Sequence, residues 1–79
     1  MYFVYAIRSQ KDERIYVGLS SNVQRRLSEH NAGYVFSTKG FLPWKLIYKE
    51  EVMNRKEARK KEKYYKSGFG KELLKSIPL

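Results

Sequence analysis

Five side chains of this sequence are of the types that bind phosphate groups, exchange protons and hold cations. They are Tyr5, Tyr16, Arg26, His30 and Glu62. An arginine can bind a phosphate through two parallel hydrogen bonds, and a histidine exchanges a proton near neutral pH. A tyrosine hydroxyl beside a cation-bound water can relay or accept a proton. Brought together, such groups are able to cleave phosphodiester bonds.

Taken one at a time, each of these residues has an ordinary structural explanation. The chain contains seven tyrosines, so packing in the core or at its rim is the default for Tyr5 and Tyr16. A lone arginine beside Arg25 is usually a solvated helix residue, and a lone histidine is usually structural. Helical spacing places Glu62 on a buried face, where a carboxylate is costly unless a cation or donors meet it. Spacing alone nevertheless favours a surface ion pair with Lys66, worth about 0.3 to 0.5 kcal/mol.

The two tyrosines lie in segments that predict a β-hairpin. Residues 2 to 7 and 14 to 18 are rich in aromatic and β-branched residues, and the polar segment between them, which contains Asp12, predicts the turn. Adjacent antiparallel strands would bring Tyr5 and Tyr16 to one face, although the length of the turn leaves the register open.

A helix is predicted directly after the hairpin. Ser21 as N-cap, with Gln24 three residues later, would form a capping box, and Gly33 is a glycine stop. Arg26 and His30 are four residues apart in this segment, so they lie on one helical face.

The central segment predicts a loop and a third strand. Residues 34 to 43 form an irregular stretch with a basic, hydroxyl-rich tip around Lys39. Residues 44 to 52 predict a strand with Trp44, Leu46 and Tyr48 on one face. A sheet of three strands follows.

A basic helix is predicted over residues 54 to 67, with Asn54 as its N-cap. Its expected buried face consists of Ala58, Glu62, Tyr65 and Phe69. Gly68 and Gly70 are expected to end this helix, and residues 71 to 76 predict a short last helix. The fold class is therefore α/β (α+β), a three-stranded antiparallel sheet flanked by helices in the order β-β-α-β-α-α.

Composition limits the class of protein. A chain of 79 residues is enough for one small domain, here residues 1 to 79, which buries roughly 60% of its unfolded surface. No stretch approaches the roughly 20 apolar residues of a membrane span, and the first residues do not resemble a signal peptide. The absence of cysteine excludes disulfides and thiolate metal sites. We expect a soluble, unprocessed cytoplasmic protein that does not bind membranes.

The charge is strongly positive and uneven. The net charge is +9, of which +2 belongs to residues 1 to 33 and +7 to residues 34 to 79. Such a surface suits a polyanion, because neutralised phosphates release their condensed counterions. A basic surface is also common in proteins that are merely soluble, so charge alone does not decide the function.

The ordered set of motifs resembles the GIY-YIG nuclease family, and the chain is similar to the small nuclease module of a bacterial excision-repair protein in that family. The two tripeptides of the family correspond to Phe3-Val4-Tyr5 and Tyr16-Val17-Gly18. Residues 20 to 31 match its helix, with Arg26 at the catalytic arginine and His30 at a position that is often histidine or tyrosine. Residues 43 to 48 resemble its third strand, and residues 57 to 62 its metal-binding helix, with Glu62 at the metal ligand.

The resemblance implies a metal-dependent endonuclease that hydrolyses a phosphodiester bond in DNA and leaves a nicked strand. One divalent cation, Mg²⁺ or Mn²⁺, would be held by Glu62, water and a phosphate oxygen. Tyr5 or Tyr16 would activate the attacking water, and Arg26 would stabilise the charge that develops on the phosphate. His30 would assist in proton transfer or positioning. We expect all five side chains to converge on one side of the sheet.

The expected partner is nucleic acid, with DNA favoured over RNA, and the resemblance points to DNA repair. Basic residues outside the five are expected to contact the substrate, namely Lys39, Arg55 and Arg59. A specific protein–DNA interface buries about 1,000 Å² or more, so sequence-specific cutting would need a protein partner for targeting. Two alternatives remain open: a non-catalytic nucleic-acid-binding module with the same fold, and a small protein that docks an acidic partner. The oligomeric state is open too.

Overall fold

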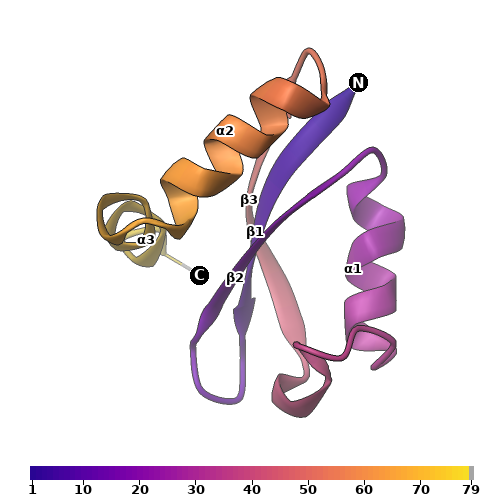
Figure 1. The fold of residues 1–79 in the computed structure, drawn as a ribbon. Helices are drawn as coiled ribbons and strands as arrows, with labels where there is room; N and C mark the ends of the chain where they lie inside the picture. Colours follow the sequence, from indigo (N-terminus) through magenta and orange to yellow (C-terminus); the bar gives the residue numbers. More distant parts are fainter. Residues whose placement is uncertain (79) are drawn as a thin grey trace.

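The computed structural model describes residues 1–78, which form a three-stranded sheet with helices on both faces (Figure 1). The elements are β1 (Tyr2–Ser9), β2 (Ile15–Ser20), α1 (Val23–Asn31), the 3₁₀ helix η1 (Lys39–Phe41), β3 (Trp44–Val52), α2 (Arg55–Lys66) and α3 (Gly68–Lys75). The predicted fold class and the order β-β-α-β-α-α are confirmed. No helix within residues 1–78 is long and apolar enough to cross a membrane.

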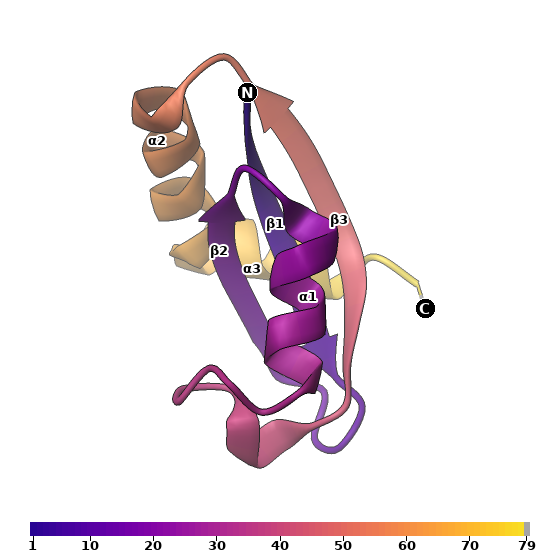
Figure 2. The same cartoon turned by 90° about the vertical axis from the view of Figure 1, so that its right-hand side faces the viewer.

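The first strand lies at the centre of the sheet. The strand order is β2-β1-β3, and both neighbours run antiparallel to β1. Residues 4 to 9 of β1 are all buried, because α2 and α3 cover one face of the sheet and α1 covers the other (Figures 1 and 2). A strand covered on both faces has a continuous apolar run, which is why residues 2 to 7 predict a strand without clean alternation.

The two faces of the sheet carry separate apolar cores. Under α2 and α3, the buried residues are Val4, Ala6, Val17, Ala58, Tyr65 and Leu74. Under α1, they are Tyr5, Ile7, Val23 and Trp44. The candidate tyrosines Tyr5 and Tyr16 belong to the second group, with Tyr16 partly buried against it.

A bulge in β3 changes the faces of its residues. Ala6 is paired with Tyr48 and Ile7 with Leu46, so Ile47 is the extra residue. Leu46 therefore packs under α1, whereas Ile47 and Tyr48 pack under α2 and α3. The prediction that Leu46 and Tyr48 share a face is wrong, because strict alternation holds only where the ladder is regular.

The helix caps differ in part from the prediction. The N-cap of α1 is Asn22, whose Oδ1 accepts a hydrogen bond from the Arg25 backbone N–H at 3.0 Å. The predicted capping box at Ser21 is wrong, since the helix begins one residue later. Asn54 is confirmed as the N-cap of α2, and it accepts from the Glu57 N–H at 2.9 Å. Gly33 follows the end of α1 with φ 81°, as a glycine stop requires.

The break between the last two helices falls at Ser67, which caps the end of α2 and the start of α3. The predicted start of the last helix at residue 71 is wrong, because Gly68 and Gly70 belong to α3. A Cβ on Gly70 would overlap the backbone of Tyr64 and Tyr65, so this glycine permits the close packing of α3 on α2. Phe69 is 84% exposed and does not join the buried face of α2.

Candidate active site

The hairpin places both tyrosines on the α1 side of the sheet. Tyr5 is paired with Gly18, and Ile7 with Tyr16, so the two tyrosines are diagonal neighbours on one face. A Cβ on Gly18 would lie 2.6 Å from Tyr5 Oη and 3.1 Å from Tyr16 Cε1. The Tyr5 side chain therefore crosses the edge strand β2 at a position that only glycine leaves open.

A buried chain of hydrogen bonds starts at the Tyr5 hydroxyl. Tyr5 Oη lies 2.9 Å from His30 Nε2, and His30 Nδ1 lies 2.8 Å from Thr38 Oγ1. The Thr38 hydroxyl donates to the Val35 carbonyl at 3.3 Å, so it accepts from the Nδ1–H of His30. His30 Nε2 is then an acceptor for the Tyr5 O–H. All three side chains are buried.

The surroundings keep the hydrogen-bonded side chains of Tyr5 and His30 uncharged at neutral pH. Burial, together with the positive charge of Arg26, lowers the pKa of His30 to about 4. Burial and the neighbouring Tyr16 raise the pKa of Tyr5 to about 12, against the opposing effect of a hydrogen bond to Arg26. Tyr5 is therefore a protonated donor to His30, whereas Tyr16 is only partly buried at the rim of the same cluster.

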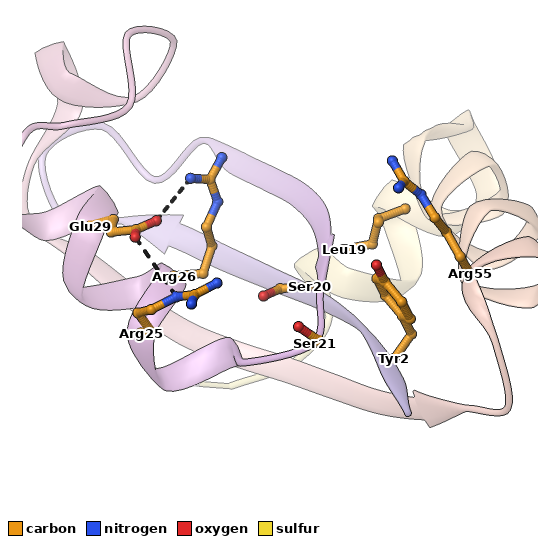
Figure 3. A pocket seen from close by; sticks show the side chains of 8 residues that line it. All are labelled: Tyr2, Leu19, Ser20, Ser21, Arg25, Arg26, Glu29 and Arg55. Carbon is orange, nitrogen blue, oxygen red and sulfur yellow. Dashed lines mark hydrogen bonds and ion pairs between the residues drawn. The ribbon is translucent and has the colours of Figure 1, made fainter.

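Arg26 lies in a basic hollow along the outer edge of β2 (Figure 3). The hollow has a volume of about 280 Å³ and is lined by Tyr2, Leu19, Ser20, Ser21, Arg25, Arg26, Glu29 and Arg55. Glu29 is the one acid among them, and its carboxylate pairs with Arg26 Nη1 at 3.0 Å and with Arg25 Nε at 3.8 Å. This pairing raises the pKa of Arg26. The lining thus contains three guanidinium groups and three hydroxyls against one carboxylate, which favours an anionic ligand such as a phosphate.

Glu62 lies in the layer opposite to α1. It lies on α2, which covers the other face of the sheet (Figure 1), so the expectation that all five side chains converge on one side is wrong. Its side chain is 19% exposed and its Oε2 lies 3.3 Å from Lys66 Nζ, the ion pair that spacing favours. Its negative charge also raises the pKa of Tyr5, so the carboxylate is within electrostatic reach of the Tyr5 hydroxyl.

Glu62 is the residue at which the sequence predicts a metal ion. Within residues 1–78 there is no group of three or more histidine, aspartate or glutamate side chains that could hold a metal ion. A cation at Glu62 would therefore take most of its ligands from water and substrate. Mg²⁺ fits this arrangement, because it dehydrates reluctantly and commonly uses one or two carboxylates.

The three predicted nucleic-acid contacts lie in different places. Arg55 lines the hollow beside Arg26. Arg59 lies on the basic surface of α2 with Lys56, Lys60 and Lys63, around a depression of about 270 Å³. Lys39 lies in η1, beyond the far end of α1, with its Nζ 4.9 Å from the centre of the Phe36 ring. The structure thus joins Arg55 to the site and leaves Lys39 and Arg59 outside it.

Thr38 and most of the residues that line the hollow are absent from the sequence prediction, which names only Arg26 and Arg55 among them. Thr38 was part of the hydroxyl-rich loop, but its bond to His30 depends on a chain reversal after α1. Arg25 and Tyr2 line the hollow, and neither carries a sequence signal beyond its type. The adjacent arginines Arg25 and Arg26 near the start of a helix are the sequence feature that could have indicated the hollow.

The fold and these side chains together define a class of protein, and comparison with known proteins gives the same class. The sequence profile of the GIY-YIG catalytic domain matches residues 1–75, so the chain belongs to the GIY-YIG family. It is 39% identical over 67 residues to a UPF0213 protein of Clostridium perfringens, covering 84% of this chain and 71% of that one. It is 34% identical over 77 residues to a UPF0213 protein of Staphylococcus haemolyticus, covering 96% of this chain and 93% of the relative.

A solved structure is similar as well. The solution NMR structure of a UPF0213 protein from Bacillus halodurans superposes with a TM-score of 0.56 at 29% sequence identity. The match covers 94% of this chain and 82% of that one. The nuclease-type fold is therefore common to this chain and to its relatives.

Proposed function

We propose that this protein is a metal-dependent endonuclease that hydrolyses a phosphodiester bond in DNA and leaves a nicked strand. The observation that carries the proposal is that Arg26 links the two parts of the site: it lines the hollow with two other arginines and interacts with Tyr5, which hydrogen-bonds to His30. Membership of the GIY-YIG family supports the same activity.

The site divides the work among its side chains. Arg26 binds the scissile phosphate and stabilises the negative charge that grows on it as the water oxygen bonds to phosphorus and the ester oxygen leaves. Arg25 and Arg55 bind the same strand from the two sides of the hollow. Glu62 would hold Mg²⁺ or Mn²⁺, which when bound polarises a phosphate oxygen.

The two tyrosines have different roles in this proposal. Tyr5 is buried, protonated and committed to His30, so it positions its neighbours and does not take the proton of the attacking water. Tyr16 is partly exposed and packs edge-on against His30 with ring centres 5.0 Å apart. We assign to Tyr16 the orientation of the water and, once its hydroxyl proton has passed to solvent, the acceptance of the water proton by the phenolate. We assign to His30 the orientation of both rings.

A non-catalytic nucleic-acid-binding module is the second candidate. The observation that favours it is the ion pair between Glu62 and Lys66, which a protein without a metal would retain. The described residues expose 5226 Å², so a specific DNA interface of about 1,000 Å² would cover about a fifth of the surface. Under either function, a protein partner would supply sequence targeting.

Nicking of supercoiled plasmid separates the two candidates. We expect open circles with Mg²⁺ or Mn²⁺ and none with chelator. Glu62→Ala should abolish metal-dependent nicking, and Arg26→Ala should lower it about 100- to 1,000-fold. Glu72→Ala is the matched control, because it removes a carboxylate that is 77% exposed and that, within residues 1–78, pairs only with Lys75. Metal-dependent nicking that survives Glu62→Ala would refute the proposed site, and DNA binding without nicking by the wild type would favour the binding module.

A further inference from the structure

Two large aromatic side chains stand exposed on the segment that follows α1. Tyr34 is 80% exposed and Phe36 is 84% exposed. Burying a side chain of this size typically contributes about 1.5 to 3 kcal/mol, and neither residue makes that contribution in the fold. Their exposure is therefore a feature that folding stability does not explain.

The segment that carries these aromatics is firmly attached at its base. The Thr38 and Lys39 backbone N–H groups donate to the Val35 carbonyl at 3.1 and 3.0 Å. Trp44 Nε1 donates to the Thr38 carbonyl at 2.9 Å, and the Thr38 hydroxyl contacts His30. The two rings are thus presented on a held loop whose base is part of the candidate site.

The chemistry of this loop fits a nucleic-acid base better than an apolar protein surface. The Lys39 ammonium lies 4.9 Å from the centre of the Phe36 ring, which places a cation for the phosphate backbone directly beside a ring that can stack on a base. The chain as a whole carries a net charge of +9, which attracts a polyanion.

We propose that Tyr34 and Phe36 stack on unpaired bases of the strand whose phosphate occupies the Arg26 hollow. The inference rests on the proposed function and adds a substrate class, single-stranded or locally unpaired nucleic acid. Arg26 lies in α1, and Tyr34 and Phe36 follow the end of that helix at Asn31, so the contacted bases lie to the side of the scissile phosphate at which α1 ends.

The test is a binding measurement without cleavage. Fluorescence anisotropy in chelator compares a labelled single strand of about 12 nucleotides, within the usual range of site sizes, with the duplex of the same sequence. We expect the Tyr34→Ala/Phe36→Ala double variant to bind the single strand at least about tenfold more weakly and the duplex as the wild type does. Phe69→Ala is the matched control, because Phe69 is an equally exposed aromatic residue on α3, and it should bind both as the wild type does.

Two further variants separate stacking from charge and from general apolar contact. Lys39→Gln should lower the slope of log K against log salt by about 0.7 for a single strand, whereas the aromatic double variant should keep that slope. Phe36→Leu should behave like Phe36→Ala, because leucine is apolar but cannot stack.

Four results would overturn the inference: wild-type affinity of the double variant for the single strand, an equal loss on the duplex, an equal loss with Phe69→Ala, or wild-type binding by Phe36→Leu. Because no cleavage is measured, a protein that stacks on single strands but never nicks plasmid would overturn only the proposed endonuclease.

Discussion

Replacing Gly18 with alanine tests whether contact across β2 holds the two tyrosines in place. The new Cβ would lie 2.6 Å from Tyr5 Oη, 2.8 Å from Tyr5 Cζ and 3.1 Å from Tyr16 Cε1. Favourable non-bonded carbon contacts are about 3.5 to 4.0 Å, so the Tyr5 ring or the strand must move by up to about 1 Å. Tyr5 is 1% exposed and cannot turn into solvent, so the strain stays in the core.

The expected loss is large enough to measure in both stability and activity. Overpacking of this kind lowers the free energy of unfolding by about 1 to 3 kcal/mol, and each kcal/mol lowers Tm by about 4 to 8 °C in a domain of this size. A misplacement of about 1 Å in a catalytic group costs roughly 100-fold in rate. We expect Gly18→Ala to melt earlier by circular dichroism and to nick plasmid about 100-fold more slowly.

Two controls make this prediction specific. Gly40→Ala adds the same methyl group where nothing lies within 4 Å, and it should leave Tm and nicking unchanged. Tyr5→Phe removes the atom nearest to the new methyl group, so the double variant with Gly18→Ala should lose less stability than the two single losses combined. A Gly18→Ala protein that melts and cleaves like the wild type would refute the close approach of Tyr5 to β2.

Two further predictions concern the buried histidine. Thr38→Val removes the acceptor of the His30 Nδ1–H, so the ring proton should move to Nε2, which the ¹⁵N shifts of the imidazole would show. The same substitution should lower the free energy of unfolding by about 1 to 3 kcal/mol. Thr38→Ser should keep the wild-type shifts, and wild-type shifts in the valine variant would contradict the assigned tautomer. His30 has a pKa of about 4 in the fold against a usual 6.5, so the unfolded chain binds the proton at a higher pH than the folded protein does. The free energy of unfolding should therefore fall by up to about 3 kcal/mol as the pH is lowered from 6.5 to 4. Urea unfolding of the wild type and of His30→Gln measures this as a difference, and identical pH profiles for the two proteins would contradict it.

Local patterns account for the elements that were predicted correctly. The β-branched and aromatic residues of β1, the N-cap Asn54 and the stop at Gly33 act over a few residues, so their consequences can be read along the chain. The same short range holds for Arg26 and His30, which share a helical face and both act on Tyr5 in the structure.

Errors arose where a contact from another element outweighed the local pattern. The bulge at Ile47 places Leu46 and Tyr48 on opposite faces of the sheet, and no local pattern in β3 predicts it. Arg8, for which the sequence predicts no role, is buried and donates to the carbonyls of Leu74, Lys75 and Ile77 at 3.3 to 3.4 Å. These hydrogen bonds join β1 to the end of α3.

From the order of residue types alone, one could derive three strands, three helices and five side chains suited to phosphodiester chemistry. Only tertiary packing determined how these side chains are arranged: Glu62 and Arg55 lie in the layer opposite to that of Arg26, and Thr38 contacts His30 from a loop. The physical reason is the distance along the sequence over which each effect acts. Propensity and capping act between near neighbours in sequence, whereas a site at the edge of a sheet is set by which helix covers which face, and burial of apolar surface decides that for the whole chain at once.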